Sequence, residues 1–146
     1  MINVFQLTDQ FKLVDLPGYG FAKVPETVRH LWGRTLERYL VGRKALLGLM
    51  LLMDARHPLT ALDVQMLRWC SARRLPVHAL LTKCDKLTRG KAASALEMVG
   101  QRAAAEFELT TVQLFSALDG RGVEEARFVL DAWFARGSGP ALSVDS

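Results

Sequence analysis

The sequence predicts an α/β fold, a three-layer sandwich in which helices cover both faces of a mostly parallel sheet. Short apolar segments alternate with longer segments of helical periodicity, which is the pattern of strand–helix–strand units. Residues 46–53 form an uninterrupted apolar run that ends at Asp54, as is typical of a parallel strand covered on both faces. One antiparallel edge strand is expected near the N-terminus, where two strand-like segments follow each other closely.

That edge strand comes from a predicted hairpin. Residues 2–7 and 11–15 have the composition of strands, and the polar residues 8–10 between them form a turn. A helix is expected to begin after Pro25, because apolar residues then recur at helical spacing.

The middle of the chain alternates between helix and strand. Thr60 is a plausible N-cap for a helix that continues to about residue 73, because its hydroxyl can accept a bond from a free backbone N–H. Residues 77–81 and 111–115 have the composition of strands, and residues 88–107 between them carry an apolar stripe at helical spacing.

A last helix precedes a short polar tail. The helix is indicated by apolar residues at i, i+3, i+4 and i+7, namely Ala126, Val129, Leu130 and Trp133. Residues 137–146 are small, polar and interrupted by glycine and proline, so we expect a flexible tail there. Residues 1–136 are expected to form a single domain.

Composition favours a globular protein of the cytoplasm. Half of the 146 residues are hydrophobic and 23% are charged, yet no apolar run approaches the roughly 20 residues that span a bilayer. The N-terminal residues do not resemble a signal peptide. The net charge of +4 permits an RNA partner without requiring one. Cys70 and Cys84 lack the spacing of a zinc or redox site.

Unusual residues follow three of the predicted strands, where open α/β sheets bind ligands. The first group is Asp15-Leu16-Pro17-Gly18. An aspartate at a strand end can hold a magnesium ion through water, and a glycine lets the backbone N–H approach a phosphate because no Cβ blocks it. The alternative is an ordinary turn between a strand and a helix, since this D-x-x-G pattern is common by chance.

The second group is Thr82-Lys83-Cys84-Asp85. A carboxylate can accept two parallel hydrogen bonds from N1–H and the exocyclic amine of guanine, a donor pair that adenine lacks. The aliphatic stem of Lys83 can lie across the base while its ammonium group stays hydrated. A solvated lysine and aspartate with no ligand is the structural alternative.

The third group is Phe115-Ser116-Ala117. A small residue there lets a backbone N–H reach the guanine carbonyl, which is weak information by itself. The three groups together are informative, because they occur in the order and at the strand ends that a guanine-nucleotide site needs.

Residues 13–25, Leu-Val-Asp-Leu-Pro-Gly-Tyr-Gly-Phe-Ala-Lys-Val-Pro, are similar to the characteristic segment of the EngB (YihA/YsxC) family of bacterial P-loop GTPases. The resemblance covers essentially the whole chain. It implies that the three groups are the third, fourth and fifth GTPase motifs, and that the chain is part of a G domain. It also implies GTP or GDP and Mg²⁺ as cofactors, with Asp15 holding the ion through water. Tyr19 stands where signalling GTPases often carry a catalytic glutamine, so no catalytic residue is assigned.

The 146 residues contain no G-x-x-x-x-G-K-[ST] motif, which members of that family carry after their first strand. Gly90-Lys91 is followed by Ala92 and is better explained as the first turn of a helix. We therefore expect this chain to bind GTP weakly and to hydrolyse it negligibly. The family's first strand would lie between the strands ending at Asp15 and Asp54, so these two are expected to pair directly or to leave a gap.

The resemblance implies a role in assembly of the large ribosomal subunit and in cell division, with no membrane span and no DNA partner. Basic residues that could contact ribosomal RNA are densest at Arg29, Arg34, Arg38, Arg43 and Lys44. One alternative is a non-catalytic remnant of a GTPase domain that binds a protein or the ribosome. Another is a receiver-like domain phosphorylated at Asp54, which would leave Lys83 and Asp85 unexplained.

Overall fold

Strands and helices alternate along the chain in the computed structural model, which describes residues 3–6, 11–16, 30, 34, 47–136 and 139–145. Side chains are described at residues 30, 34 and 47–136. The elements are β1 (Asn3–Gln6), β2 (Phe11–Leu16), β3 (Gly48–Asp54), α2 (Ala61–Ala72), β4 (Val77–Thr82), the 3-10 turn η1 (Cys84–Lys86), α3 (Arg89–Glu106), β5 (Thr110–Leu114), α4 (Val123–Arg136) and β6 (Gly139–Asp145). The helix expected after Pro25 lies outside the described residues, apart from His30 and Arg34, which are both helical and exposed.

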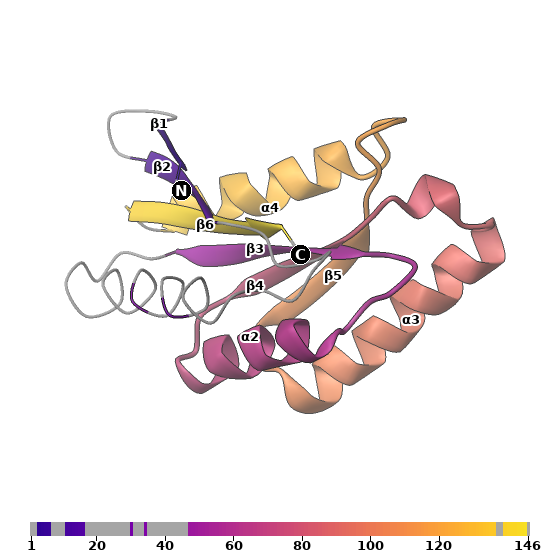
Figure 1. Cartoon of the computed structure of the whole chain (residues 1–146). Coiled ribbons are helices and arrows are strands. Elements are labelled where there is room, and N and C mark those ends of the chain that lie inside the picture. The colour runs from indigo at the N-terminus through magenta and orange to yellow at the C-terminus, as the bar shows by residue number, and fades with distance from the viewer. Residues whose placement is uncertain are drawn as a thin grey trace.

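The six strands form one sheet in the order β1-β2-β6-β3-β4-β5 (Figure 1). β1 and β2 are antiparallel, with Asn3 opposite Asp15, and every other pairing is parallel. The predicted hairpin and the mostly parallel sheet with an antiparallel edge strand are therefore confirmed. Parallel strands place their carboxyl ends at one edge, which is where the three predicted motifs begin.

The C-terminal segment differs from its prediction. Residues 137–146 were expected to be a flexible tail, but Gly139–Asp145 forms β6, a parallel strand between β2 and β3. The expectation that β2 and β3 would pair directly or leave a gap is also wrong. Two strand edges inside a sheet carry unpaired N–H and C=O groups, and an extended segment between them satisfies both edges at once. Pro140 is tolerated because it lies opposite Lys12 only, and pairing with β3 begins one residue later at Ala141.

Helices cover the two faces of the sheet, so the three-layer prediction is confirmed. α2 and α3 lie on one face and α4 lies on the other (Figure 1). The larger core cluster contains Leu51, Leu67 and Val99 from β3, α2 and α3, and the smaller one joins Met50 and Leu80 to Trp133 of α4. Within the described ranges, no helix combines the length and the apolar character that crossing a bilayer requires.

Two local features explain where α2 begins and how closely α4 packs on β3. Thr60 caps α2 as predicted: its Oγ1 accepts a bond from the backbone N–H of Asp63, whose carboxylate accepts the N–H of Thr60 in return. Gly48 lies directly under the indole of Trp133, because a Cβ there would be only 2.7 Å from three ring atoms. The absence of a side chain at Gly48 therefore lets α4 pack closely on β3.

Hydrogen bonds between buried polar side chains link β4 to β5 and β5 to the residue before α4. His78 is 2% exposed, with Nδ1 2.6 Å from Oγ1 of Thr111 and Nε2 2.7 Å from Oε1 of Gln113. The amide of Gln113 donates to the carbonyl oxygen of Gly122 at 2.7 Å. Since Oε1 can only accept, Nε2 of His78 must carry the proton and Nδ1 must accept from Thr111. Burial lowers the pKa of His78, although the bond to Gln113 opposes that shift.

We expect the stability of the protein to fall as the pH drops below about 6.5, the ordinary histidine pKa. The pKa of His78 is lower in the folded state than in the unfolded state. The contribution of His78 to the free energy of unfolding is therefore complete above the unfolded pKa and is lost as the pH falls through the folded pKa. Urea unfolding at pH 7.5 and pH 5 measures the change. His78→Gln should flatten this dependence, whereas the same substitution at the exposed His57 should not. If the free energy of unfolding changed equally with pH in the two variants, His78 would not be the source of the dependence.

Candidate functional site

The carboxyl ends of β2, β3 and β4 lie at one edge of the sheet. Asp54 at the end of β3 is in register with Thr82 at the end of β4, and Asp15 near the end of β2 is in register with Ser143 of the intervening β6. The loop after β5 joins them, because the backbone N–H of Phe115 donates to Leu81 at 2.9 Å. Of the first predicted group, Asp15 and Leu16 are at this edge as part of β2, whereas Pro17 and Gly18 lie outside the described residues.

The second and third predicted groups are in direct contact. Oγ of Ser116 donates to Oδ1 of Asp85 at 2.7 Å, and the backbone N–H of Cys84 donates to the carbonyl of Phe115 at 3.3 Å. Ser116 is fully buried, and its hydroxyl also accepts the N–H of Asp119. One oxygen of Asp85 is thereby fixed by the loop, while the carboxylate as a whole stays partly exposed. An oriented and accessible acceptor is what recognition of a paired donor requires.

Lys83 turns the chain sharply between β4 and η1. Its φ of 59° lies in the left-handed region, which is uncommon for a residue with a side chain. The turn leaves Cys84 buried under the loop and Lys83 exposed on the other side. Lys83 and Asp85 line the same cavity, and their role as a base-binding pair stays a prediction.

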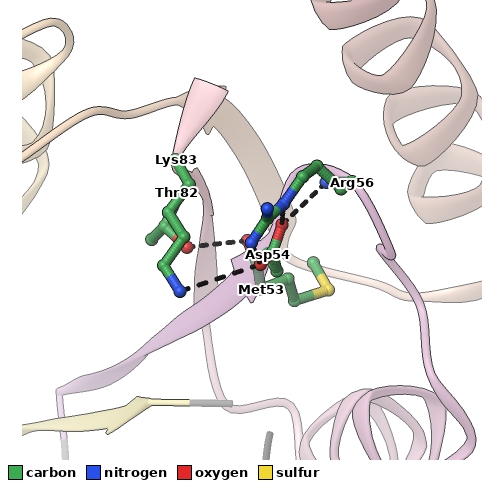
Figure 2. A network of polar contacts seen from close by, with 5 residues as sticks. All are labelled: Met53, Asp54, Arg56, Thr82 and Lys83. Atoms are coloured by element: carbon green, nitrogen blue, oxygen red, sulfur yellow. Dashed lines mark hydrogen bonds and ion pairs between the residues drawn. The ribbon is translucent and has the colours of Figure 1, made fainter. Parts of the chain in front are cut away.

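Asp54 forms ion pairs with Arg56 and Lys83, a feature that the sequence analysis did not identify (Figure 2). Its Oδ1 accepts the backbone N–H of Arg56 at 2.9 Å and Nε at 3.0 Å, and its Oδ2 accepts Nη2 at 2.7 Å. Nζ of Lys83 is 3.9 Å from the same Oδ2. The hydrogen bond from the Arg56 side chain lowers the pKa of Asp54, with smaller contributions from the nearby positive charges. An aspartate at a strand end followed two residues later by an arginine is the signal that could have indicated this ion pair.

A cavity of about 530 Å³ opens beside Asp85. This volume is in the range of small-molecule sites. Its lining combines apolar side chains, such as Phe115 and Leu118, with polar ones, such as Asp85 and Lys83. The described residues that line it are Leu52, Thr82, Lys83, Asp85, Lys86, Phe115, Ala117 and Leu118. Leu118 is 79% exposed and was not predicted as a site residue. A flat aromatic ring with polar groups on one edge fits such a lining, because the faces of the ring need apolar contacts and its polar edge needs a hydrogen-bond acceptor.

Relatives of known name resemble the chain along most of its length. It is 50% identical over 136 residues to the probable GTP-binding protein EngB of Nitrosomonas europaea. This match covers 93% of this chain and 61% of that protein. It is 49% identical to the protein of the same name from Nitrosococcus oceani, over 94% of this chain and 68% of the relative. The chain belongs to the EngB family of GTP-binding proteins. The EngB of Azoarcus sp. strain BH72 is 47% identical over 97% of the chain and 70% of its own length.

Solved structures of much lower sequence identity have a similar fold. Translation elongation factor SelB of Methanococcus maripaludis, in complex with the GTP analogue GppNHp, superimposes with a TM-score of 0.55 and 14% identity, over 60% of this chain and 20% of SelB. Its apo form gives a TM-score of 0.56 over 67% of this chain and 22% of SelB. At this level of identity the likenesses concern the α/β fold alone. No protein-family model matches the chain, and the chain spans about three fifths of the length of the Nitrosomonas EngB.

Proposed function

We propose that this EngB chain recognises the guanine base of GTP and GDP through Asp85. The observation that carries the proposal is the bond from the buried Ser116 to Asp85, a residue that lines the cavity, because this bond holds the carboxylate in one orientation. Guanine donates from N1 and from its exocyclic amine to such a carboxylate, and each charge-assisted bond contributes roughly 1.5–3 kcal/mol. Adenine lacks this donor pair, so the site discriminates by chemistry as well as by shape.

We further propose, on the basis of the family resemblance, where the phosphates and the metal ion bind. Asp15 would hold Mg²⁺ through water, and the backbone of Gly18 would approach the terminal phosphate. The position of Asp15 near the carboxyl end of β2, at the same edge of the sheet as the end of β4, supports this part of the proposal. GTP hydrolysis is the reaction that the family type implies. Tyr19 cannot orient water as a glutamine does, so we assign no catalytic residue.

The polypeptide of these 146 residues should bind GTP weakly and hydrolyse it negligibly. It contains no G-x-x-x-x-G-K-[ST] motif, whose backbone and lysine surround the phosphates in P-loop proteins. At roughly 1.5–3 kcal/mol for each charge-assisted contact, three missing contacts convert a micromolar affinity into a millimolar or weaker one. The same observation favours a second candidate, a non-catalytic domain that binds a protein or the ribosome without nucleotide.

Family resemblance also carries the cellular role that we propose, which is assembly of the large ribosomal subunit in the cytoplasm and normal cell division. The net charge of +4 is compatible with a ribosomal RNA partner. Arg34 is the member of the densest basic group that the structure describes, and it is exposed on a helical turn.

Calorimetric titration of the 146-residue polypeptide with GDP and ADP, in the presence of Mg²⁺, tests the proposal. We expect a millimolar Kd for GDP and at least tenfold weaker binding of ADP, because only guanine offers the donor pair. Equal affinities would refute the assignment of Asp85. A micromolar Kd for GTP with ordinary turnover would refute weak binding alone, and no binding of either nucleotide would favour the second candidate.

A further inference from the structure

The carboxyl ends of β3 and β4 are joined by hydrogen bonds that continue past the last residue of β3 (Figure 2). Asp54 is in register with Thr82, and the backbone N–H of Ala55 donates to the carbonyl oxygen of Thr82 at 2.8 Å. The hydroxyl of Thr82 donates to the carbonyl oxygen of Met53 at 3.2 Å. Because these bonds fix the backbone, Asp54 and Lys83 have defined positions at the ends of two neighbouring strands.

The side chain of Lys83 extends from the end of β4 towards the end of β3. Its Cα follows Thr82, whereas its Nζ lies 3.9 Å from Oδ2 of Asp54. Lys83 and Asp85 both line the cavity, and Asp54 is not among the described residues that do so. The methylene groups of Lys83 are therefore held at both ends, by the backbone at one end and by the ion pair at the other.

The carboxylate of Asp54 is well suited to hold this ammonium group. The Asp54 side chain is 16% exposed, so solvent screens its charge less than that of a fully exposed pair. The backbone N–H, Nε and Nη2 of Arg56 all donate to it and fix its orientation. A carboxylate that is already ordered loses little further freedom when it pairs with a second cation.

A lysine that is held at its ammonium group presents its stem in fewer conformations. The side chain has many rotamers when it is free, and ordering them opposes ligand binding. The contact expected of this stem is with the flat face of the base, which every purine offers. The bonds expected of Asp85 depend instead on the groups at the edge of the base. The ion pair should therefore raise the affinity for purine nucleotides without selecting among them.

We propose that Asp54 is a positioning residue of the nucleotide site, which acts through the ammonium group of Lys83 to hold the lysine stem against the face of the purine base. This inference rests on the proposed function, because Asp54 can act in this way only if Lys83 contacts the base. The two carboxylates then have separate effects, since Asp54 sets the affinity and Asp85 sets the choice of base.

Titration of the 146-residue polypeptide and its Asp54→Asn variant with GDP and IDP, followed by nuclear magnetic resonance, tests the proposal. The hypoxanthine of IDP has the ring face and the N1–H of guanine but lacks the exocyclic amine. We expect the variant to bind both nucleotides at least about threefold more weakly, with an unchanged ratio of the two affinities. The sign of the change is informative, because removal of a negative charge by itself favours an anionic ligand.

Lys83→Met provides the background in which the effect of Asp54 should disappear. Methionine keeps an unbranched apolar stem but has no ammonium group for Asp54 to hold. Adding Asp54→Asn to Lys83→Met should not weaken the binding of GDP any further. Lys83→Met alone removes the same ion pair, so it should weaken both nucleotides and leave their ratio unchanged. The test therefore does not depend on whether Asp54→Asn folds, which circular dichroism shows.

Arg56→Gln is the matched control. It removes the other ion pair of Asp54 and leaves Nζ of Lys83 beside the carboxylate. The affinity of this variant for GDP should stay within about twofold of the wild type. A loss as large as that of Asp54→Asn would show that the Asp54–Arg56 pair, and not the contact with Lys83, is what matters, and would overturn the inference.

Three further results would overturn it. The first is unchanged or tighter binding of GDP by a folded Asp54→Asn variant. The second is an equal loss of affinity when Asp54→Asn is added to Lys83→Met, because Asp54 would then act through the fold. The third is a change in the ratio of the GDP and IDP affinities. The proposed function survives each of these results if the wild type still prefers GDP to IDP, whereas a wild type without that preference refutes both.

Discussion

Replacing Asp85 by asparagine is expected to abolish the preference for guanine and to create one for xanthine. The carboxylate would accept two charge-assisted hydrogen bonds from guanine, together worth roughly 3–6 kcal/mol, or about 10²- to 10⁴-fold in affinity. An asparagine amide has one acceptor and one donor on that edge. It therefore matches xanthine, which has a carbonyl in place of the exocyclic amine. Titration of the variant with GDP and XDP measures the reversal as a ratio of affinities.

Asp119→Asn is the matched control for this substitution. Asp119 lies in the loop between β5 and α4, where its backbone N–H donates to the hydroxyl of Ser116, and it is not among the described residues that line the cavity. Its carboxylate accepts the N–H of Arg121, a bond that lowers its pKa and that an asparagine oxygen can also accept. The control should retain the preference for guanine. A preference that survives Asp85→Asn would remove the central residue of the proposed function.

Gly122→Ala is expected to lower the free energy of unfolding by about 2–5 kcal/mol. The φ of Gly122 is +86°, which costs an alanine roughly 1–2 kcal/mol. A Cβ there would also overlap the carbonyl oxygen of Leu114 and lie 2.6 Å from Nε2 of Gln113. Relieving such an overlap typically costs about 1–3 kcal/mol more. Urea unfolding at pH 7.5, followed by circular dichroism, measures the sum.

Gly120→Ala separates backbone strain from the steric overlap. Gly120 also has a positive φ, +80°, but nothing lies within 4 Å of a Cβ built there. The control should therefore lose only the strain component, about 1–2 kcal/mol. Equal losses in the two variants would show that the loop relaxes around the methyl group of residue 122. The Gln113 amide would then be a less rigid support for α4 than its two bonds suggest.

The order of the elements was predictable because their patterns are local. The apolar run before Asp54 and the helical spacing up to Trp133 are complete within one strand or helix, so neighbouring residues suffice to indicate them. The contact between Asp85 and Ser116 could also be anticipated, because both follow parallel strands whose carboxyl ends share an edge.

Features that depend on distant partners were not predictable in the same way. Gly139 and Pro140 are signals of a loop, and only the free edges of β2 and β3 make their segment a strand. His78 has apolar residues on both sides in β4, and its role depends on Thr111 and Gln113, which are more than thirty residues away. Pairings of this kind arise from tertiary structure, which overrides local propensity.

The central place of β6 also has a consequence for the order of folding. Synthesis produces β6 after every strand that it must join, although it belongs to the interior of the sheet. Among the described strands, β2 and β3 are joined only through β6, so this part of the sheet is completed only after residues 139–145 have been made. Pairings so distant in sequence form slowly, and the exposed strand edges can associate with other chains in the meantime. The yield of soluble protein should therefore depend on how quickly residues 139–145 reach their place.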